Sequence, residues 1–473
     1  MLQEPPIPKD LWDLIPPLAQ AALLALLGNL QTELADLRQQ VAALNARLGQ
    51  NSQNSSKPPS SDTPNVKRPP PREPSGRRRG AQPGHELHRR PLLPPDEEIP
   101  RKPTACRRCG EALTGSDPQP LRHQVIELPP IKPLVTEYQL HRLLCPRCGA
   151  STCAALPDGV PAGQQGPRLQ GVLAVLTGAY RLSKDQAVTL CADVFNIPIC
   201  PGTVCQLEQQ TTAALAPVVE ELREHIKTEH ANLDETSWRE EGKRAWLWVA
   251  VTALVTVFHI ARSRGGAVAR CLLGPGLHWV VTSDRYSAYK WLALRRRQLC
   301  WAHLRRDFQA MIDRDNAGSV IGHELLLFSD DVFHWWYRVR DGTLRRSSMR
   351  TCIAGQRPWL RDLLEKGSVC GCAKTAGMCR ELLKLEPALW TFLRVEGVEP
   401  TNNAAERALR HAVLWRKSSY GTASAKGSHY VANILTVVAT CRQQGRNVLE
   451  FVTACCQARL QGRPAPSLLP TPG

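Results

Sequence analysis

The sequence predicts a multidomain α/β protein, and three observations support this fold class. The chain has 473 residues, more than the ~100–200 residues of a typical single domain. Residues 228–301 alternate short β-branched and aromatic runs with helical runs, the order expected of a mixed α/β sheet. Helical periodicity dominates residues 165–225 and most of the chain after residue 302. We therefore expect a sheet-bearing core with helical regions before and after it in the sequence.

Charge and cysteine content indicate which class of partner the chain binds and in which cellular compartment it works. The formal net charge is +17 and the sequence pI is about 9.4, and the commonest partner of so basic a chain is nucleic acid. The 17 cysteines include Cys-x-x-Cys pairs and follow no secretory leader, which indicates a metal site in a reducing compartment. No apolar run reaches the ~20 residues of a membrane span. We expect a soluble intracellular protein.

Residues 1–50 predict an N-terminal helix that self-associates. Apolar residues recur there at alternating spacings of three and four, which is an a/d heptad seam. The seam consists of Leu23, Leu27, Leu30, Leu34, Leu37, Val41, Leu44 and Leu48. Its polar flanks favour a coiled coil in a homo-oligomer. The alternative, an amphipathic helix packed on its own domain, stays open.

Residues 51–104 are rich in proline and arginine. Such a composition cannot bury a core, so we expect an extended or disordered linker. Its Arg77-Arg78-Arg79 cluster could contact phosphates, although a solvated linker is the simpler interpretation for most of this stretch.

Residues 105–155 carry two Cys-x-x-Cys-Gly knuckles and predict a zinc-binding domain. Each knuckle places two thiolates on a tight turn, and two knuckles supply the tetrahedral four-sulfur shell of a structural zinc. The predicted Zn²⁺ ligands are Cys106, Cys109, Cys145 and Cys148. A β-insert between the knuckles is expected from Gln124–Leu128 and Val135–Leu140.

Residues 165–225 predict helices in a helix-turn-helix order. Apolar periodicity covers Leu169–Tyr180, Ser183–Phe195 and Thr203–Leu215, and a short turn separates the last two. This order suits a DNA-reading motif, and it suits an ordinary packing unit equally well.

Residues 226–301 predict the sheet-bearing part of the core, and residues 302–398 predict a helical region. Strands are expected at Thr228–Asp234, Ala245–Leu254, Val255–Ser263, His278–Asp284 and Gln298–Trp301, with helices at Gly265–Leu273 and Ser287–Leu294. Residues 399–462 then predict a helix over Pro400–Trp415 and a closing helix pair near Tyr430–Arg442 and Asn447–Arg459.

Three acidic residues have positions that suit catalysis. Asp234 and Asp284 each end a predicted strand, and Glu406 lies in the first turn of a predicted helix. Carboxylates are the ligands that Mg²⁺ takes from proteins, and two such ions can clamp the attacking and leaving oxygens of a phosphoryl transfer. Simpler interpretations remain: strand-end or turn residues for the two aspartates, and a capping box of Asn403 with Glu406. Rival acids are Asp307, Asp330 and Asp331.

These residues lie in blocks that resemble the insertion-sequence-66 family of bacterial DDE transposases, specifically their large subunit. The resemblance covers nearly the whole chain. It is carried by the linker signature Asn54–Asp62, the doubled Cys-x-x-Cys-Gly, and the blocks Asp234–Thr236, Ser283–Tyr289, Cys300–Arg306, Thr401–Arg410 and Trp415–Ser418. The segment Cys370–Lys374 matches no block of the family.

The resemblance implies an RNase H-like catalytic core with a helical insertion between the second aspartate and the glutamate. It implies Asp234, Asp284 and Glu406 as a catalytic triad that binds two Mg²⁺ (or Mn²⁺) ions. The implied reaction is hydrolysis of a phosphodiester at the end of an insertion sequence, followed by attack of the exposed 3′-hydroxyl on target DNA. The implied DNA partners are the element's terminal inverted repeats and the target. Accessory proteins of the same element and a place in the bacterial cytoplasm, at the nucleoid, are also implied.

Arginines near the acids are candidates for DNA contact. They are Arg285, Arg305, Arg306, Arg407 and Arg410. A solvated basic helix face is the simpler interpretation. The alternatives for function are another metal-dependent nuclease or junction resolvase, a non-catalytic or decayed DNA-binding regulator, and a zinc-bearing coiled-coil scaffold. Strand nicking and strand joining distinguish them.

Overall fold

The computed structural model describes residues 8–51, 55–57, 62 and 91–470. The chain divides into two compact units. The first consists of residues 1–67, 158–183 and 206–473, and the second of residues 68–157 and 184–205. Most of the predicted linker, with its arginine cluster, lies outside the described residues.

A five-stranded mixed sheet is the centre of the first unit. Its strands are β3 (Ala231–Glu240), β4 (Lys243–Val251), β5 (Thr256–Ala261), β6 (Val281–Ser283) and β7 (Arg297–Leu299). Their order across the sheet is β5-β4-β3-β6-β7. The β3–β4 and β4–β5 pairs are antiparallel, whereas β3–β6 and β6–β7 are parallel. The prediction of a mixed α/β arrangement is confirmed.

The hairpin between β3 and β4 explains one wrong prediction. Glu241 and Gly242 have φ angles of 54° and 70°, so the turn has two residues with positive φ, as a tight type I′ connection requires. Pairing therefore continues to Glu240 and Lys243. Asp234, predicted to end its strand, instead lies inside β3.

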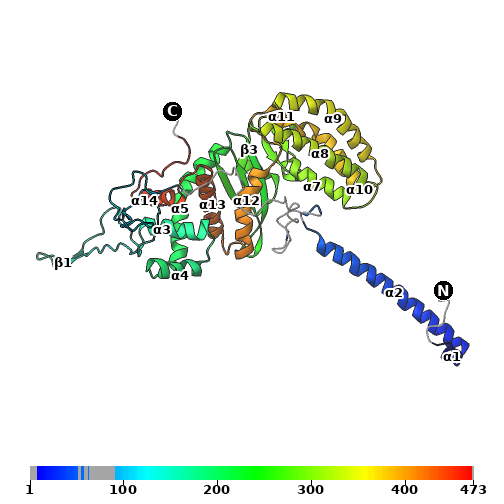
Figure 1. The fold of residues 1–473 in the computed structure, drawn as a ribbon, viewed down its shortest axis with the longest axis horizontal. Coiled ribbons are helices and arrows are strands. Elements are labelled where there is room, and N and C mark those ends of the chain that lie inside the picture. The colour runs from blue at the N-terminus through cyan, green and yellow to red at the C-terminus, as the bar shows by residue number, and fades with distance from the viewer. Residues whose placement is uncertain (1–7, 52–54, 58–61, 63–90, 471–473) are drawn as a thin grey trace. The chain divides into compact units, whose positions relative to one another are not determined.

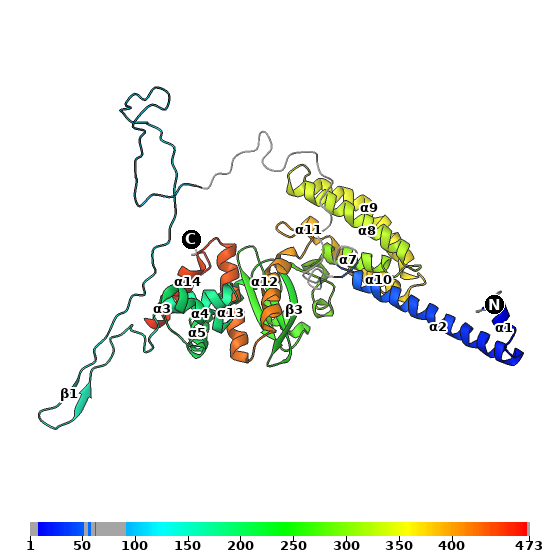
Figure 2. The same ribbon diagram turned by 60° about the horizontal axis from the view of Figure 1, so that its bottom comes forward.

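Helices cover both faces of the antiparallel part of the sheet. Helices α12 (Asn403–Ser419) and α13 (Ala425–Gln443) pack on one face, in a core that contains Trp238, Leu247 and Phe258. Helices α5 (Pro201–Ile226) and α6 (Gly266–Leu273) contribute to the core of the opposite face, which contains Leu233 and Trp248. Figures 1 and 2 show α12 and α13 beside the strands in both views.

The remaining helices of this unit pack next to these cores. Helix α3 (Pro167–Ala174) continues into a π-helical turn, η2 (Val175–Ala179), and α14 (Val448–Leu460) packs against α3. At Gly178, an added Cβ would lie 2.3 Å from the Ile434 side chain of α13, so only glycine allows this close approach. The predicted closing helix pair corresponds to α13 and α14.

The region between β7 and α12 is helical, as predicted. It contains α7 (Trp301–Ile312), α8 (Ser319–Arg340), α9 (Arg346–Ser368), α10 (Ala373–Leu385), η5 (Glu386–Leu389) and α11 (Thr391–Arg394). These helices have their own apolar core around Trp301, Phe328 and Trp390. Val280 and Leu299 of the sheet region join that core, so the helices continue the core of the sheet.

The predicted N-terminal helix is present over the whole heptad seam. A short helix, α1 (Lys9–Trp12), precedes α2 (Pro17–Gly49), which contains every seam residue. Most seam residues of α2 are exposed, Leu48 at 83%.

The second unit contains α4 (Lys184–Phe195) and a small hairpin of β1 (Arg142–Leu144) and β2 (Ser151–Cys153). The predicted β-insert is wrong for residues 124–128 and 135–140, which have no strand pairing. Strands instead flank the second knuckle, because the tight turn from Cys145 to Gly149 returns the chain on itself.

One further prediction is wrong. The helix expected at Ser287–Leu294 is replaced by two single 3₁₀ turns, η3 (Ser287–Tyr289) and η4 (Leu294–Arg296). Across the described ranges, no helix combines the length and apolar composition needed to cross a membrane.

Candidate functional site

Asp234 lies in β3, and Asp284 directly follows β6, the parallel strand beside β3. The two aspartates lie at the same height along these strands. The register pairs Ala231 with Val281 and Asn232 with Thr282. Each aspartate lies two residues beyond the second of these pairs. Because side chains alternate along a strand, both project to the face of Asn232 and Thr282. On β3 that face also carries Trp238, which packs on α12. The structure thus places both predicted aspartates beside each other, facing the helix that carries Glu406.

Glu406 lies in the first turn of α12, as predicted, but the capping-box interpretation is wrong. The residue that caps the helix is Asn402, not Asn403, and its side chain makes no capping bond. The Asn402 side chain turns instead to β3, where its Nδ2 donates to the Leu233 carbonyl at 2.9 Å. Its Oδ1 accepts from Asn232 Nδ2 at 3.1 Å. The start of α12 is therefore fastened to β3 one residue before Asp234.

Cys300 connects the same helix start to β6. Its backbone N–H donates to the Ser283 carbonyl at 2.9 Å, one residue before Asp284. Its Sγ accepts the backbone N–H of Asn402 at 3.1 Å. The Trp301 N–H also donates to the Pro400 carbonyl at 2.9 Å. These bonds hold the backbones that carry the three predicted carboxylates in one arrangement.

The electrostatics of the aspartates indicate a cluster of negative charge. Burial raises the pKa of Asp234 well above its ordinary value, and the carboxylates of Glu235, Asp284 and Glu406 raise it further. Burial also raises the pKa of Asp284, against the lowering effect of the Tyr286 N–H that bonds its Oδ1 at 2.8 Å. Buried carboxylates that repel one another are stabilised when a cation binds between them.

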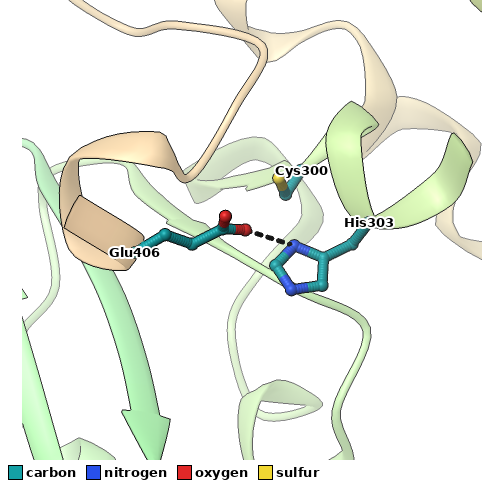
Figure 3. A group of neighbouring side chains, drawn as sticks. All are labelled: Cys300, His303 and Glu406. Atoms are coloured by element: carbon teal, nitrogen blue, oxygen red, sulfur yellow. Dashed lines mark ion pairs between the residues drawn. The ribbon is translucent and has the colours of Figure 1, made fainter. Parts of the chain in front are cut away.

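A second group of ligand atoms surrounds Glu406 (Figure 3). The ligand atoms of Cys300, His303 and Glu406 lie within 4.8 Å of one another, and they are the one such group among the described residues. His303 Nδ1 lies 3.4 Å from Glu406 Oε1, and Arg306 Nη2 donates to the same oxygen at 3.2 Å. Burial and the guanidinium groups of Arg306 and Arg285 lower the pKa of His303 to about 3, so its ring is neutral.

The donor sets fit two kinds of metal. Asp234, Asp284 and Glu406 offer only carboxylate oxygens, the hard ligands that Mg²⁺ and Mn²⁺ take. Cys300 and His303 add a soft sulfur and an imidazole nitrogen, which suit later transition metals. Burial raises the pKa of the Cys300 thiol to about 12, which keeps it protonated and disfavours the thiolate that a metal requires. The three carboxylates are thus the donor set that suits a hard divalent cation, although in the described part of the chain their oxygens do not form a group within 4.8 Å of one another.

Sequence reasoning did not assign Asn402, Cys300 or Glu235. Glu235 is buried on the opposite face of β3, where Arg264 Nε donates to it at 2.8 Å and the Tyr289 hydroxyl also donates to it. Asn402 and Cys300 lie within the blocks Thr401–Arg410 and Cys300–Arg306, so the signal for them was present. The partners of Asn402, which include the Cys300 sulfur, lie about a hundred or more positions away in the chain and could not be read from the sequence.

The five predicted DNA-contact arginines divide into two groups. Arg285 pairs with Asp307 at 2.8 Å and with Glu381, Arg305 pairs with Asp330, and Arg306 bonds Glu406. These three are engaged by carboxylates within the protein. Arg407 and Arg410 are exposed on α12, one and four positions after Glu406.

The two cysteine knuckles have matching geometry. The Gly110 N–H donates to the Cys106 carbonyl, and the Gly149 N–H donates to the Cys145 carbonyl, each at 2.9 Å. Backbone N–H groups of Cys109 and Arg108 lower the pKa of the Cys106 thiol, and the equivalent groups lower that of Cys145. Both pairs suit a metal thiolate. Among the described residues the four sulfurs are not gathered into one group, so the four-sulfur shell stays a prediction.

Comparison with protein families gives three matches along the chain. A family described as "Transposase IS66 family" matches residues 163–430, more than half of the chain and all three carboxylates. A "zinc-finger binding domain of transposase IS66" matches residues 103–149, which contain all four knuckle cysteines. A family of unknown function, DUF6444, matches residues 9–91.

Two curated proteins of Sinorhizobium fredii are similar to the chain. The "uncharacterized protein y4qI" is 29% identical over 248 residues, which are 47% of this chain and 45% of that protein. The "uncharacterized protein y4hP" is 25% identical over 381 residues, which are 72% of this chain and 68% of that protein. The chain thus matches less than half of the length of the first relative and about two thirds of the second.

Proposed function

The chain belongs to the IS66 family of transposases, and on this premise we propose that it is a DNA transposase that cleaves strands at the ends of an insertion sequence and joins them to target DNA. The observation that carries the proposal is the level placement of Asp234 and Asp284 on parallel strands, facing the helix of Glu406.

We propose that the mixed sheet with α12 is an RNase H-like core and that the three carboxylates are its catalytic triad. The strand order β5-β4-β3-β6-β7 supports this, with the aspartates on β3 and directly after β6. Asp234, Asp284 and Glu406 would hold two Mg²⁺ or Mn²⁺ ions. When bound, such ions activate the attacking oxygen and stabilise the leaving oxygen of an in-line phosphoryl transfer.

The chain's own residues orient this site. Asn402 and Cys300 hold the strand ends and the helix start together. Arg306 of α7 bonds the Glu406 carboxylate, and His303 of the same helix lies 3.4 Å from it. Arg407 and Arg410, exposed on the same helix as Glu406, are placed to contact DNA phosphates. Arg285 and Arg305 would contact DNA only after release from their carboxylate partners.

The other parts of the chain would bring DNA and partners to this core. We propose that residues 105–155 bind a structural Zn²⁺ through the four cysteines and that residues 165–225 contact the element end. The exposed seam of α2 supports a homo-oligomeric coiled coil formed by residues 1–50. Residues 302–398 would be the insertion, between core parts 226–301 and 399–462. We also propose that the chain acts together with accessory proteins of the same element and is located at the bacterial nucleoid.

The test is strand cleavage and strand transfer by the purified chain on element-end DNA with Mg²⁺ or Mn²⁺. The wild type should expose a 3′ end and join it to target DNA. Asp284→Ala should bind the same DNA and do neither, whereas the matched Asp331→Asn, an exposed acid on α8, should do both. A wild type that binds but does not cut, with neighbouring gene products added, would point to a regulator.

A further inference from the structure

A basic pocket lies at the end of α12 that is remote from the carboxylates. Its volume is about 650 Å³, and its lining residues are Ser237, Trp238, Arg239, Arg244, Arg416, Lys417 and Tyr420. Four of these seven residues carry a positive charge and none carries a negative charge. None of these seven residues was predicted from the sequence to have a functional role.

The backbone after α12 builds one wall of the pocket. Tyr420 has a φ of 60° and Gly421 a φ of 122°, so the chain turns sharply where the helix ends. A Cβ on Gly421 would lie 2.2 Å from the Arg239 carbonyl oxygen, so only glycine fits there. The Thr422 N–H donates to that carbonyl at 2.9 Å. The end of α12 is thereby fixed against β3.

The positive charge of the pocket is not neutralised within it. The Arg416 guanidinium donates to Thr236 Oγ1 at 2.9 Å, to Ser237 Oγ at 2.6 Å and to the Ser237 carbonyl, all of them neutral oxygens. The acids of the β3–β4 region, Glu240 and Glu241, pair with Arg262 at 2.7 and 3.2 Å. A half-buried guanidinium without a carboxylate partner is a site for an external anion.

Two basic side chains of the pocket are already ordered. Arg239 donates to the Gly242 carbonyl at 3.0 Å, and the Arg244 guanidinium lies over the Trp246 ring at 5.3 Å. Binding an anion would therefore cost little further side-chain ordering. The Tyr420 ring is 78% exposed at the edge of the pocket, where an aromatic face can stack on a base or sugar.

The pocket and the carboxylates share the same two elements. β3 carries Asp234 and Arg239, and α12, which lies beside β3 in both ribbon views, carries Glu406 and Arg416. Because side chains alternate along a strand, Arg239 and its pair partner Arg244 project to the face of β3 opposite Asp234, whereas Arg416 and Lys417 lie on the helix of Glu406. Five strand residues span about 16 Å and ten helix residues span about 15 Å. At a rise of about 3.4 Å per nucleotide of one strand, this separation corresponds to about four to five nucleotides.

We propose that the basic pocket binds DNA backbone phosphates about four to five nucleotides from the phosphodiester that is cut. This inference rests on the proposed cleavage at the carboxylates. DNA is favoured over an acidic peptide because Arg416 and Lys417 lie on the same helix as Glu406 and because the chain has a net charge of +17.

The first test measures binding of element-end DNA without added Mg²⁺ or Mn²⁺, so that no cleavage occurs and the proposed structural Zn²⁺ is kept. Arg244→Glu combined with Lys417→Glu should weaken binding by about tenfold and reduce the slope of log affinity against log salt by about two. The matched control, Arg338→Glu with Arg340→Glu, reverses two exposed charges at the end of α8 and should change neither quantity. Melting curves check that both variants fold.

The second test replaces one backbone phosphate at a time with a neutral methylphosphonate. The replaced position is moved stepwise away from the cut. Wild-type affinity should fall when positions about four and five nucleotides away are neutral, and the double variant should lose this sensitivity. Binding and salt slope like those of the wild type would overturn the pocket proposal, even where the wild type cleaves normally. Normal DNA binding with lost self-association would also overturn it, in favour of an acidic segment of a second copy. If the wild type does not cleave DNA but the pocket variants still weaken DNA binding, only the catalytic proposal is rejected.

Discussion

Asp234 on β3 and Asp284 after β6 lie at the same level of two parallel strands, each two residues beyond the paired Asn232 and Thr282. Both are half-buried, and the negative charge of Asp284 contributes to the raised pKa of Asp234. An arrangement that destabilises two ionised carboxylates is suited to binding a divalent cation.

The raised pKa of Asp234 predicts a stabilising substitution. An acid whose pKa is higher in the folded state stabilises the fold while protonated, and this contribution is lost as the pH rises through the folded-state pKa. In EDTA at pH 8, Asp234→Asn should therefore melt above the wild type. Each unit of pKa shift is worth about 1.4 kcal/mol, and each kcal/mol raises the melting temperature by about 2–4 °C.

The pH dependence identifies the cause of that stabilisation. The difference between the melting temperatures of Asp234→Asn and wild type should shrink as the pH is lowered toward 4, because both side chains are then neutral. A difference that is negative, or that stays constant with pH, would show that carboxylate repulsion is not its source.

Asn402 is predicted to hold the site together. Asn402→Ala would leave the buried Leu233 carbonyl without the Asn402 amide, and it would remove one of the two acceptors of the Asn232 amide, which keeps the Thr401 carbonyl at 3.2 Å. The unsatisfied carbonyl costs about 1–3 kcal/mol, so the melting temperature should fall by roughly 2–12 °C. Cleavage should fall as well, because Glu406 loses its position. Asn403→Ala, one residue later and half-buried, is the matched control. Equal melting temperatures for the two variants would contradict this role.

His303 is predicted to act through Glu406 as a positioning residue. His303→Ala should raise the Mn²⁺ concentration that half-saturates cleavage by about 10–100-fold, the usual effect of removing a group that orients a metal ligand. His303→Asn, which keeps a donor near Glu406, should recover part of the loss. His323→Ala, exposed on α8, is the control. An unchanged Mn²⁺ requirement with intact folding would assign His303 to packing alone.

The knuckles predict one bound zinc per chain. Cys148→Ser should lose that zinc, measured by elemental analysis of the purified protein, because a four-sulfur site needs every ligand. Cys153→Ser removes an exposed cysteine of β2 that lies outside the knuckles and should keep the zinc. Equal zinc content in the two variants, or none in the wild type, would reject the assignment.

Much of the fold could be predicted from periodicity, since β4, β5 and α6 have clear apolar patterns and α2 has a heptad seam. The length of β3 could not, because its outer half, Glu235–Glu240, is polar in sequence and is stabilised by the hairpin with β4. The three candidate carboxylates were predicted from expected strand ends and family blocks, although Asp234 lies inside β3 rather than at its end. The contacts of Glu406 with His303 and Arg306 join positions about a hundred residues apart, which no local pattern encodes.

The central claim is that three carboxylates form one catalytic metal site, and parallel cleavage rates test it most directly. Asp234→Asn, Asp284→Asn and Glu406→Gln should each bind element-end DNA but cleave it at least about a thousandfold more slowly, since the metal ions supply several kcal/mol of transition-state stabilisation. Asp331→Asn should cleave like the wild type. If any of the three variants retains wild-type cleavage in Mg²⁺ and Mn²⁺, that carboxylate is not part of the catalytic site.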